Sequence, residues 1–453
     1  MKRLLRLGLV LCLYSIGIGC GETYRPIIIP NPPVFPNPAA AHTVVAINDN
    51  GIIVPGSAMV IDVSGDTDVS VMDVGLAPVH AVQQTASVVL VVNHSVNGAV
   101  SDSITKLNFN GTEIGSTGTI SLPANSAPDF VAVAPTDTTA YVTLPSYTPP
   151  SVGVINSQSD NLVATIPVGN NPDAIAVTPD KSKLYVANQG SNSVSGFNTV
   201  DLSSRTIIGG FNAPLWVVAR SDSQRVYVLN GNGVVSTTDI TSTTGPDSVI
   251  DASINAPGAA YMLYDGNKNR LYIPGGSQLT MLDVSQSTPQ PLGASPITIP
   301  IVPPSSRSAP GDSCFGTTPQ PSTFTVAAVA ALPDGSRAYV GAYYEDTSGN
   351  FCPQVTVIDA VSNTIKSSIA IPGFPAYDAF CSAQSSRPPR FRITMAAGGD
   401  STRAYLASCD GGMVNIIDTS NDTYILNLPA PVSSRAGNPL NPPQNPVFLF
   451  AGP

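Results

Sequence analysis

The chain has 453 residues, of which 42% are hydrophobic and only 11% charged, and its formal net charge is −10. Nucleic-acid binding requires clustered Lys and Arg, so this charge balance argues against it. The chain is poor in helix formers and has no long segment in which hydrophobic residues recur with the period of a helix, which argues against a helical fold. The acidic residues are scattered, as on a soluble surface, and an acidic face for a cationic ligand is the alternative.

The N-terminus has the pattern of an export signal. Three basic residues among the first six precede the apolar run from Leu7 to Ile18, which is too short to span a bilayer. Gly17-Ile18-Gly19-Cys20 then resembles a bacterial lipobox, although Gly17 stands where that motif prefers Leu. The resemblance implies a lipoprotein-type signal peptide over 1–20, lipidation of Cys20 and, because Gly21 follows, anchoring in the outer membrane. A plain signal peptide cleaved nearby is the alternative.

A Pro-rich segment over 21–41 follows the signal. Proline stiffens a chain towards polyproline II, which rises ~3.1 Å per residue. We therefore expect a tether over 21–41 and a single domain over 42–453.

That domain is built on an internal repeat. Each copy opens with a Pro and a short apolar strand, continues through a strand containing Tyr-Val, and reaches a third strand of the type Val-Ile-Asp and a weaker fourth. The clearest copy runs from Asn171 to Asn188. Tyr141, Tyr185, Tyr227 and Tyr272 recur at intervals of 44, 42 and 45 residues. Four short strands in such a period indicate a β-propeller blade.

The strand Leu184-Tyr185-Val186-Ala187-Asn188 makes the copies similar to the YVTN-type β-propeller repeat. The resemblance covers about residues 43–453. It implies an all-β fold of four-stranded blades and implies little about function, because the repeat residues of that family are packing residues.

Seven copies begin at or near the following residues: Pro78, Pro128, Pro172, Pro214, Pro257, Phe324 and Pro375. Residues 43–74 supply a second, third and fourth strand without a first, and Asn445 to Pro453 supply a first strand alone. We expect the two ends to complete one composite blade, which gives eight blades and removes the exposed edges of an open ring. Seven blades with an outlying N-terminal hairpin is the alternative.

Four cysteines lie beyond the signal segment: Cys314, Cys352, Cys381 and Cys409. An even number in an exported chain suggests disulfides, and three pairings are possible. The loop before a blade's first strand and the loop between its second and third strands emerge on one face, so we expect Cys314–Cys352 and Cys381–Cys409. A four-Cys metal site is the alternative, without CxxC support.

The sequence contains no recognisable catalytic motif and no motif for a cofactor, so none is expected. Its three histidines are His42, His80 and His94. The stretch from Asp62 to Asp68 has three acids but not the spacing of an EF-hand, and we interpret it as a polar turn.

The first strands of a propeller converge at its channel, so the residues just after each repeat Pro are the candidate ligand-binding residues. They are His80, Asp129, Asp173, Trp216 and Tyr377. Aromatic and acidic groups there could hold a sugar, a peptide or a cation, or the rings could merely pack between blades. The inserts at 285–323 and 381–391 are candidate recognition loops on the same face.

These features favour a membrane-tethered extracytoplasmic binding module, expected to be monomeric, for an unidentified protein or glycan partner. A lactonase-like hydrolase with its site at the channel mouth is the second hypothesis, with His80, Asp129 and Asp173 as the residues to test. A structural protein of the cell envelope is the third.

Overall fold

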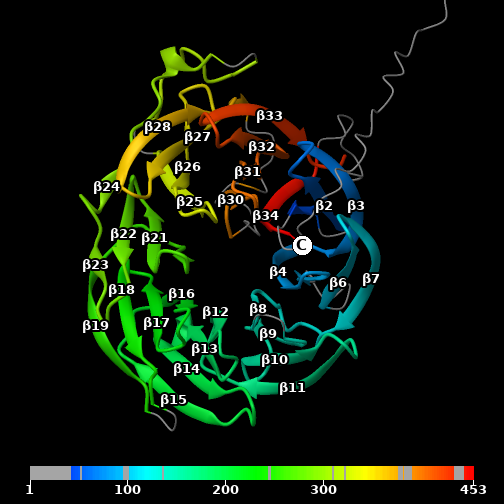
Figure 1. Ribbon diagram of the computed structural model, residues 1–453. Helices are drawn as coiled ribbons and strands as arrows, with labels where there is room; N and C mark the ends of the chain where they lie inside the picture. The colour runs from blue at the N-terminus through cyan, green and yellow to red at the C-terminus, as the bar shows by residue number, and fades with distance from the viewer. Residues whose placement is uncertain are drawn as a thin grey trace, which may run out of the picture. The chain divides into compact units, whose positions relative to one another are not determined.

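The computed structural model describes residues 42–51, 54–94, 102–134, 137–242, 246–308, 311–320, 323–375, 381, 390–432 and 443–452. The signal over 1–20 with Cys20, the tether over 21–41, and Tyr377 lie outside the described residues. Residues Ala40–Pro453 form one compact unit, in which eight antiparallel sheets stand radially in a ring (Figure 1). Each sheet is a blade, so the protein is an eight-bladed β-propeller.

Each blade has four main strands, which run from the axis outwards as follows. Blade 1 contains β34 (Asn445–Ala451), β1 (Thr43–Asp49), β2 (Pro55–Asp62) and β3 (Thr67–Leu76); blade 2 contains β4 (Pro78–Thr85), β5 (Val88–Asn93), β6 (Ser103–Asn110) and β7 (Glu113–Ser121); blade 3 contains β8 (Val131–Val133), β9 (Thr139–Leu144), β10 (Ser151–Asn156) and β11 (Asn161–Pro167); blade 4 contains β12 (Pro172–Val177), β13 (Lys183–Asn188), β14 (Ser193–Asn198) and β15 (Ser204–Gly209).

The second half of the ring follows the same plan. Blade 5 contains β16 (Pro214–Ala219), β17 (Arg225–Asn230), β18 (Val234–Asp239) and β19 (Ser248–Asn255); blade 6 contains β20 (Leu263–Asp265), β21 (Arg270–Gly275), β22 (Gln278–Asp283) and β23 (Gln290–Pro291), with β24 (Ile297–Thr298) also on β22; blade 7 contains β25 (Thr325–Ala331), β26 (Arg337–Glu345), β27 (Asn350–Asp359) and β28 (Thr364–Ala370), with β29 (Phe374–Pro375) also on β27; blade 8 contains β30 (Ile393–Ala397), β31 (Arg403–Ser408), β32 (Met413–Asp418) and β33 (Thr423–Pro429). Short 3-10 helices occupy Gln189–Ser191 and Pro304–Ser306. Within the described part of the chain, neither they nor any other helix has the length and apolar character needed to cross a membrane.

The two ends of the chain complete blade 1, as the sequence predicts. Strand β34 pairs antiparallel with β1, so that Ala46 faces Leu449 and Ile47 faces Phe448. This pairing gives the innermost strand of blade 1 from the C-terminus and the other three from the N-terminus. The seven-blade alternative is therefore wrong.

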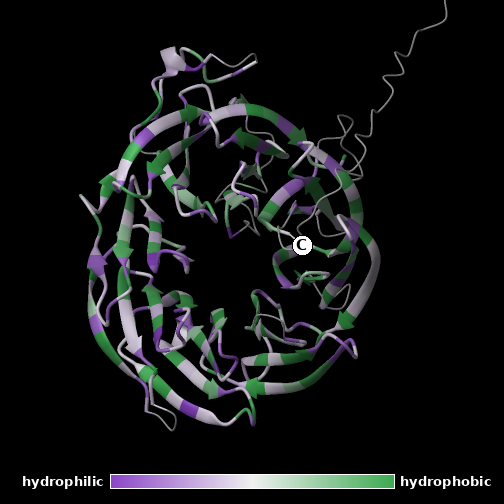
Figure 2. Cartoon of the chain, viewed as in Figure 1, coloured by the Kyte–Doolittle hydropathy of each residue, from purple (hydrophilic) through white to green (hydrophobic). Residues whose placement is uncertain are grey.

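Burial explains why the middle strands of the blades lose the alternating pattern of half-exposed strands. The side chains of β13 and β17 are all buried, because neighbouring blades cover both faces of each sheet. The outermost strand β33 alternates between exposed and partly buried residues, because it faces solvent. Hydrophobic residues accordingly occur in the strands of every blade (Figure 2).

In five blades the third strand ends in an Asp that shapes the next turn. The Asp359 carboxylate accepts hydrogen bonds from the backbone N–H groups of Val361 and Ser362, both at 2.8 Å. Asp62 accepts in the same way from Ser64 at 2.9 Å. These side chains satisfy backbone donors within the turn, which supports the polar-turn interpretation of the Asp62 segment.

A second set of acids joins neighbouring blades. In four blades an Asp in the turn between the third and fourth strands forms an ion pair with a basic residue of the preceding blade. The pairs are Lys106–Asp160, Arg205–Asp247, Arg337–Asp422 and Arg403–Asp66. The recurring Tyr of the second strand contributes in two of these blades, since Tyr185 donates to Asp247 and Tyr339 donates to Asp422. We call these contacts the inter-blade clasps.

The predicted start of the last copy of the repeat is wrong. The sequence places it near Pro375, but Phe374–Pro375 is β29, which pairs with β27 of blade 7. The first strand of blade 8 begins at Ile393, after the insert. In the sequence this strand follows Pro389-Arg390-Phe391, which matches Pro128-Asp129-Phe130 in blade 3. The insert therefore displaced the expected start of this copy from Pro389 to Pro375.

Candidate functional site at the channel mouth

The repeat places equivalent residues of different blades around one cavity of about 520 Å³. The residue directly after the repeat Pro lines it in six blades: Val79, Asp129, Asp173, Leu215, Arg390 and Val447. The rest of its wall consists of Asp49, Pro78, His94, Ala127, Pro145, Gln189 and Ala260. The mouth of the channel is therefore built on one layer of the repeat, in which three of these six positions are apolar and three are charged.

The next residue of each repeat forms the floor beneath this cavity. Its aromatic members are His80, Phe130, Trp216, Phe391 and Phe448, joined by Tyr261. Phe130 and Trp216 meet edge to face with ring centroids 5.0 Å apart, and Tyr261 and Phe391 lie 5.1 and 5.8 Å from Trp216. Four of the rings are buried, whereas Tyr261 and Phe448 are partly buried. The rings pack against one another, and all but Phe391 also line a further cavity of about 520 Å³.

Arg390 is the centre of the mouth. Its Nη2 donates to Asp129 Oδ2 at 2.8 Å and also to Asp173 Oδ1. Its guanidinium carbon lies 5.6 Å from the centroid of Phe130 and 5.6 Å from that of Trp216. Blade 8, which carries Arg390, stands opposite blade 4 in an eight-membered ring, so this side chain ties together two sides of the channel.

His80 lies in the floor and is not available as a base. Its ring stacks on Phe130 with centroids 3.8 Å apart, and its Nδ1 accepts a hydrogen bond from the Val131 N–H at 3.4 Å. Burial lowers the pKa of His80 well below its usual value, and the Arg390 charge lowers it further. The imidazole is therefore neutral at pH 7.

The positive charge of Arg390 only partly compensates the negative charge of the Asp173 carboxylate. Burial raises the pKa of Asp173 to about 6; the Arg390 charge opposes this rise, and the nearby Asp129 carboxylate adds to it. Two carboxylates share one guanidinium nitrogen here, so a proton competes for the remaining negative charge.

This shift gives a pH-dependent prediction. A carboxyl group with a raised pKa in the folded state loses stabilisation as the pH rises from its unfolded value through its folded value. The free energy of unfolding of Asp173→Asn, relative to wild type, should therefore increase by on the order of 2 kcal/mol between about pH 4 and about pH 6.5. Thermal unfolding of both proteins across this pH range measures the difference. Asp201→Asn, at a fully exposed turn, is the matched control and should show no such change above pH 5. A pH-independent difference for Asp173→Asn would contradict this assignment.

The structure thus brings four of the five candidate residues together. His80, Asp129, Asp173 and Trp216 meet at the mouth and its floor, whereas Tyr377 lies outside the described residues. Sequence reasoning missed Arg390 and Phe391. The signal that could have found them is the run Arg387 to Arg392, which places three Arg within six residues of a chain that has only 20 basic residues.

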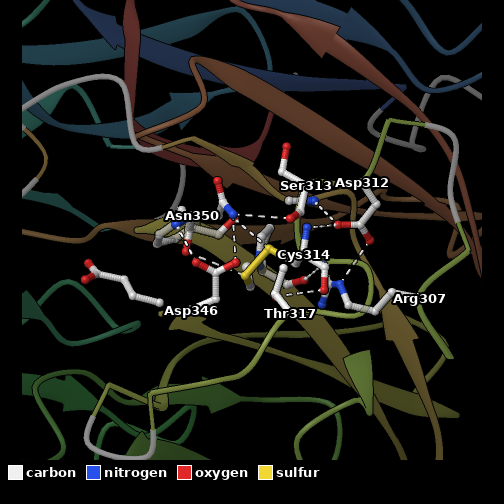
Figure 3. The surroundings of a disulfide bond; sticks show 12 residues. Arg307, Asp312, Ser313, Cys314, Thr317, Asp346 and Asn350 are labelled. Carbon is white, nitrogen blue, oxygen red and sulfur yellow. Dashed lines mark hydrogen bonds and ion pairs between the residues drawn. A yellow bond between two sulfur atoms is a disulfide. The ribbon is translucent and has the colours of Figure 1, made fainter. Parts of the chain in front are cut away.

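The insert at 285–323 is fixed to blade 7 and, in its described part, contributes no residue to the cavity wall. The disulfide Cys314–Cys352 joins it to β27 (Figure 3). The buried Arg307 donates through Nε to Asp312 at 2.9 Å, and Asp312 in turn accepts from the N–H groups of Cys314 and Gly373. The other insert supplies Arg390 and Phe391, so it is the one that reaches the mouth.

Both expected disulfides are present, since Cys381 pairs with Cys409 as well. They indicate an oxidising, extracytoplasmic environment. Among the described residues, Cys314, Cys352 and Asp346 are the one group of possible metal ligands within reach of one another. Their two sulfur atoms are joined to each other and are not thiolates, so the four-Cys metal site is wrong.

The charged groups at the mouth could hold a ligand. None of the described residues lining the cavity carries a hydroxyl or thiol nucleophile. The two carboxylates face a guanidinium, and His80 is neutral with its Nδ1 engaged. The arrangement can hold a polar or charged ligand group through Asp129, Asp173 and Arg390 while the aromatic floor closes the channel below.

Comparison with known proteins supports the fold class. No protein-family model matches the chain, and no curated protein matches its sequence. Among solved structures it resembles the dihydro-heme d1 dehydrogenase NirN in complex with DHE, with a TM-score of 0.58, 12% identity and coverage of 86% of this chain and 73% of that one. Apo AztD from Citrobacter koseri has a TM-score of 0.54, 9% identity and coverage of 90% and 97%. A functionally unknown protein from Desulfotomaculum acetoxidans has a TM-score of 0.53, 11% identity and coverage of 91% and 100%. At these identities the similarity shows the fold alone.

Proposed function

We propose that this protein is a membrane-tethered, extracytoplasmic binding module that takes a macromolecule or glycan at the channel mouth. The observation that carries the proposal is the cavity of about 520 Å³, into which charged residues of four different blades converge. Concave sites with a few converging polar groups are the usual form of a ligand site. We further propose that the blades are YVTN-type repeats, on the strength of the strand Leu184 to Asn188.

A mouth-filling variant tests the proposal. The exposed Ala260 lines the cavity, and Val200 lies in the turn after β14, where its side chain is 93% exposed. The full chain would be screened on an array of oligosaccharides and an array of peptides, and the strongest hits titrated. Ala260→Trp should weaken binding about tenfold or more by filling the site, whereas the matched Val200→Trp should bind as wild type does. If no hit distinguishes these two variants, the mouth is not the binding site.

The hydrolase hypothesis is tested in parallel. The raised pKa of Asp173 beside Arg390 is the observation that favours it, because a carboxyl group that titrates near pH 6 could transfer a proton. Lactone hydrolysis would be assayed with and without divalent metal. We expect no rate above that of Asp173→Asn, because the carboxylates are paired with Arg390 and His80 is neutral. A metal-dependent rate that Asp173→Asn abolishes would replace the binding proposal.

Membrane tethering is tested at Cys20. Cys20→Ser should move the protein from the membrane fraction to the soluble fraction of a bacterial host and abolish incorporation of a labelled fatty acid, because stable anchoring needs the attached acyl chains. Cys12→Ser, within the apolar run of the signal, is the matched control and should stay membrane-bound. Retention of Cys20→Ser in the membrane would overturn the tether. If the tethered protein binds neither array, its recovery in a stable complex with envelope components would favour the structural hypothesis.

A further inference from the structure

The mouth contains more negative than positive charge. Asp129 and Asp173 line the cavity beside one guanidinium, that of Arg390, and Asp49 and His94 lie in the same wall. Arg390 reaches Asp129 Oδ2 and Asp173 Oδ1 with a single nitrogen, Nη2. The two carboxyl groups also lie close enough for a side-chain hydrogen bond to each other when one of them is protonated. A site of this kind repels anions and attracts a second cation.

The position of Arg390 shows what the site recognises. Its guanidinium is held by two carboxylates, and it also lies over the faces of Phe130 and Trp216 at 5.6 Å each. Ion pairing and cation–π attraction act together on a partly desolvated cation here. We call the space between Asp129 and Asp173, above these two rings, the guanidinium seat.

The seat favours a protein ligand over a glycan. A sugar ring binds to an exposed aromatic face, but Phe130 is 8% exposed and Trp216 is 6% exposed, and their faces are covered by Arg390 and neighbouring rings. A long, narrow cationic side chain needs no such platform. The cavity above the seat is larger than one arginine side chain, so it has room for the backbone that would carry the side chain.

Resting on the proposed function, we propose that the mouth binds an Arg or Lys side chain presented by a protein partner, and that Arg390 occupies the guanidinium seat until the partner's cation displaces it from Asp129 and Asp173. Arg390 is then an internal competitor carried on the insert of blade 8. The raised pKa of Asp173 agrees with this, because a proton and a cation compete for the same carboxylate. Affinity should accordingly rise as the pH increases through about 6.

The test uses a matched pair of peptides and four forms of the full chain. The peptides are acetyl-Gly-Gly-Arg-Gly-Gly-amide and the same peptide with citrulline, which has the shape of arginine without its charge. The proteins are wild type, Arg390→Ala, Asp173→Asn and, as a control with the same change in net charge, Asp201→Asn. Affinities would be measured by titration calorimetry at pH 7.5.

We expect Arg390→Ala to bind the Arg peptide about tenfold more tightly than wild type, because the seat is empty. Asp173→Asn should bind it about tenfold more weakly, Asp201→Asn should match wild type, and the citrulline peptide should bind about tenfold more weakly than the Arg peptide. Equal affinity for the two peptides, or no gain in Arg390→Ala, would overturn the inference. Because Arg390→Ala could loosen the mouth, Arg390→Gln is measured as well and should show the same gain.

Failure of this inference is distinguishable from failure of the proposed function. A glycan that Ala260→Trp releases but the Arg peptide does not displace would overturn the guanidinium seat and leave the mouth as a binding site. If Ala260→Trp releases no ligand of any class, the proposed function fails and the inference fails with it.

Discussion

Deletion of residues 445–453 is expected to prevent the propeller from folding. The deletion removes β34, so β1 loses its inner partner along its whole length, and blade 1 keeps only three strands. The buried Val447 and Leu449, which pack with residues of blades 2 and 8, are removed as well. An open ring exposes two apolar blade faces and an unpaired strand edge. Soluble yield and a cooperative thermal transition should both be lost.

A point substitution tests the burial of β34 without shortening the chain. Leu449 is 3% exposed in β34, whereas Ile425 is 37% exposed in the outer strand β33. Leu449→Asp should destabilise the protein by about 3–5 kcal/mol, because it buries an unpaired charge, and Ile425→Asp by less than about 1 kcal/mol. Cooperative unfolding of the truncated chain at the wild-type midpoint would show that the ends do not close the ring.

Asp247→Ala is expected to cost about 3–5 kcal/mol, the range for breaking a buried ion pair. The side chains of Asp247 and Arg205 are 0% and 1% exposed, and the pair joins blades 4 and 5. Asp247 also accepts from the hydroxyl group of Tyr185 at 2.8 Å. Without the carboxylate, a buried guanidinium and a buried phenol lose their shared partner, and the thermal midpoint should fall by several degrees.

Asp239→Ala in the same blade is the matched control. Asp239 pairs with Arg225 at 3.2 Å, but its side chain is 32% exposed. A solvent-screened pair of this kind contributes at most about 1 kcal/mol. The turn hydrogen bond that Asp239 accepts from the Thr241 N–H lies at an exposed position, so the control should lose much less stability than Asp247→Ala. Equal losses in the two variants would contradict the special role of the inter-blade clasp, and added salt should separate them further, because it screens only the exposed pair.

The fold could be predicted because the copies of the repeat carry the same residue types at the positions that determine strand, packing and turn. A Pro before the first strand, a buried Tyr in the second and an Asp after the third recur in most blades, and each is a local requirement of strand, packing or turn. The first-strand phrase at Asn445 could be matched to the blade that lacked one. The disulfide pairing could be predicted because the topology of a blade shows which of its loops emerge on the same face. The clasps could not be predicted, since Asp247 and Arg205 belong to different blades and their spacing depends on the intervening loop.

The residues of the site could be predicted only in the blades whose repeat Pro had been assigned correctly. His80, Asp129, Asp173 and Trp216 could be placed at the mouth by counting from the repeat Pro. Arg390 was missed because the insert before blade 8 contains several prolines, and the copy was started at Pro375. The neutrality of His80 and the raised pKa of Asp173 depend on burial and on Arg390. Both arise from the tertiary structure, so the residues next to His80 and Asp173 in the sequence do not indicate them.

The two chain ends complete one blade, and this closure brings the first strands to a common mouth. Deuterium exchange of the intact protein, followed by peptide mass spectrometry, measures it directly. The amides of Val447 to Leu449 and of their partner strand β1 should exchange as slowly as those of the buried strand β5, since both are paired in the ladder. Exchange of β34 at the rate of an exposed turn, while β5 stays protected, would show that the ring is open and contradict the account.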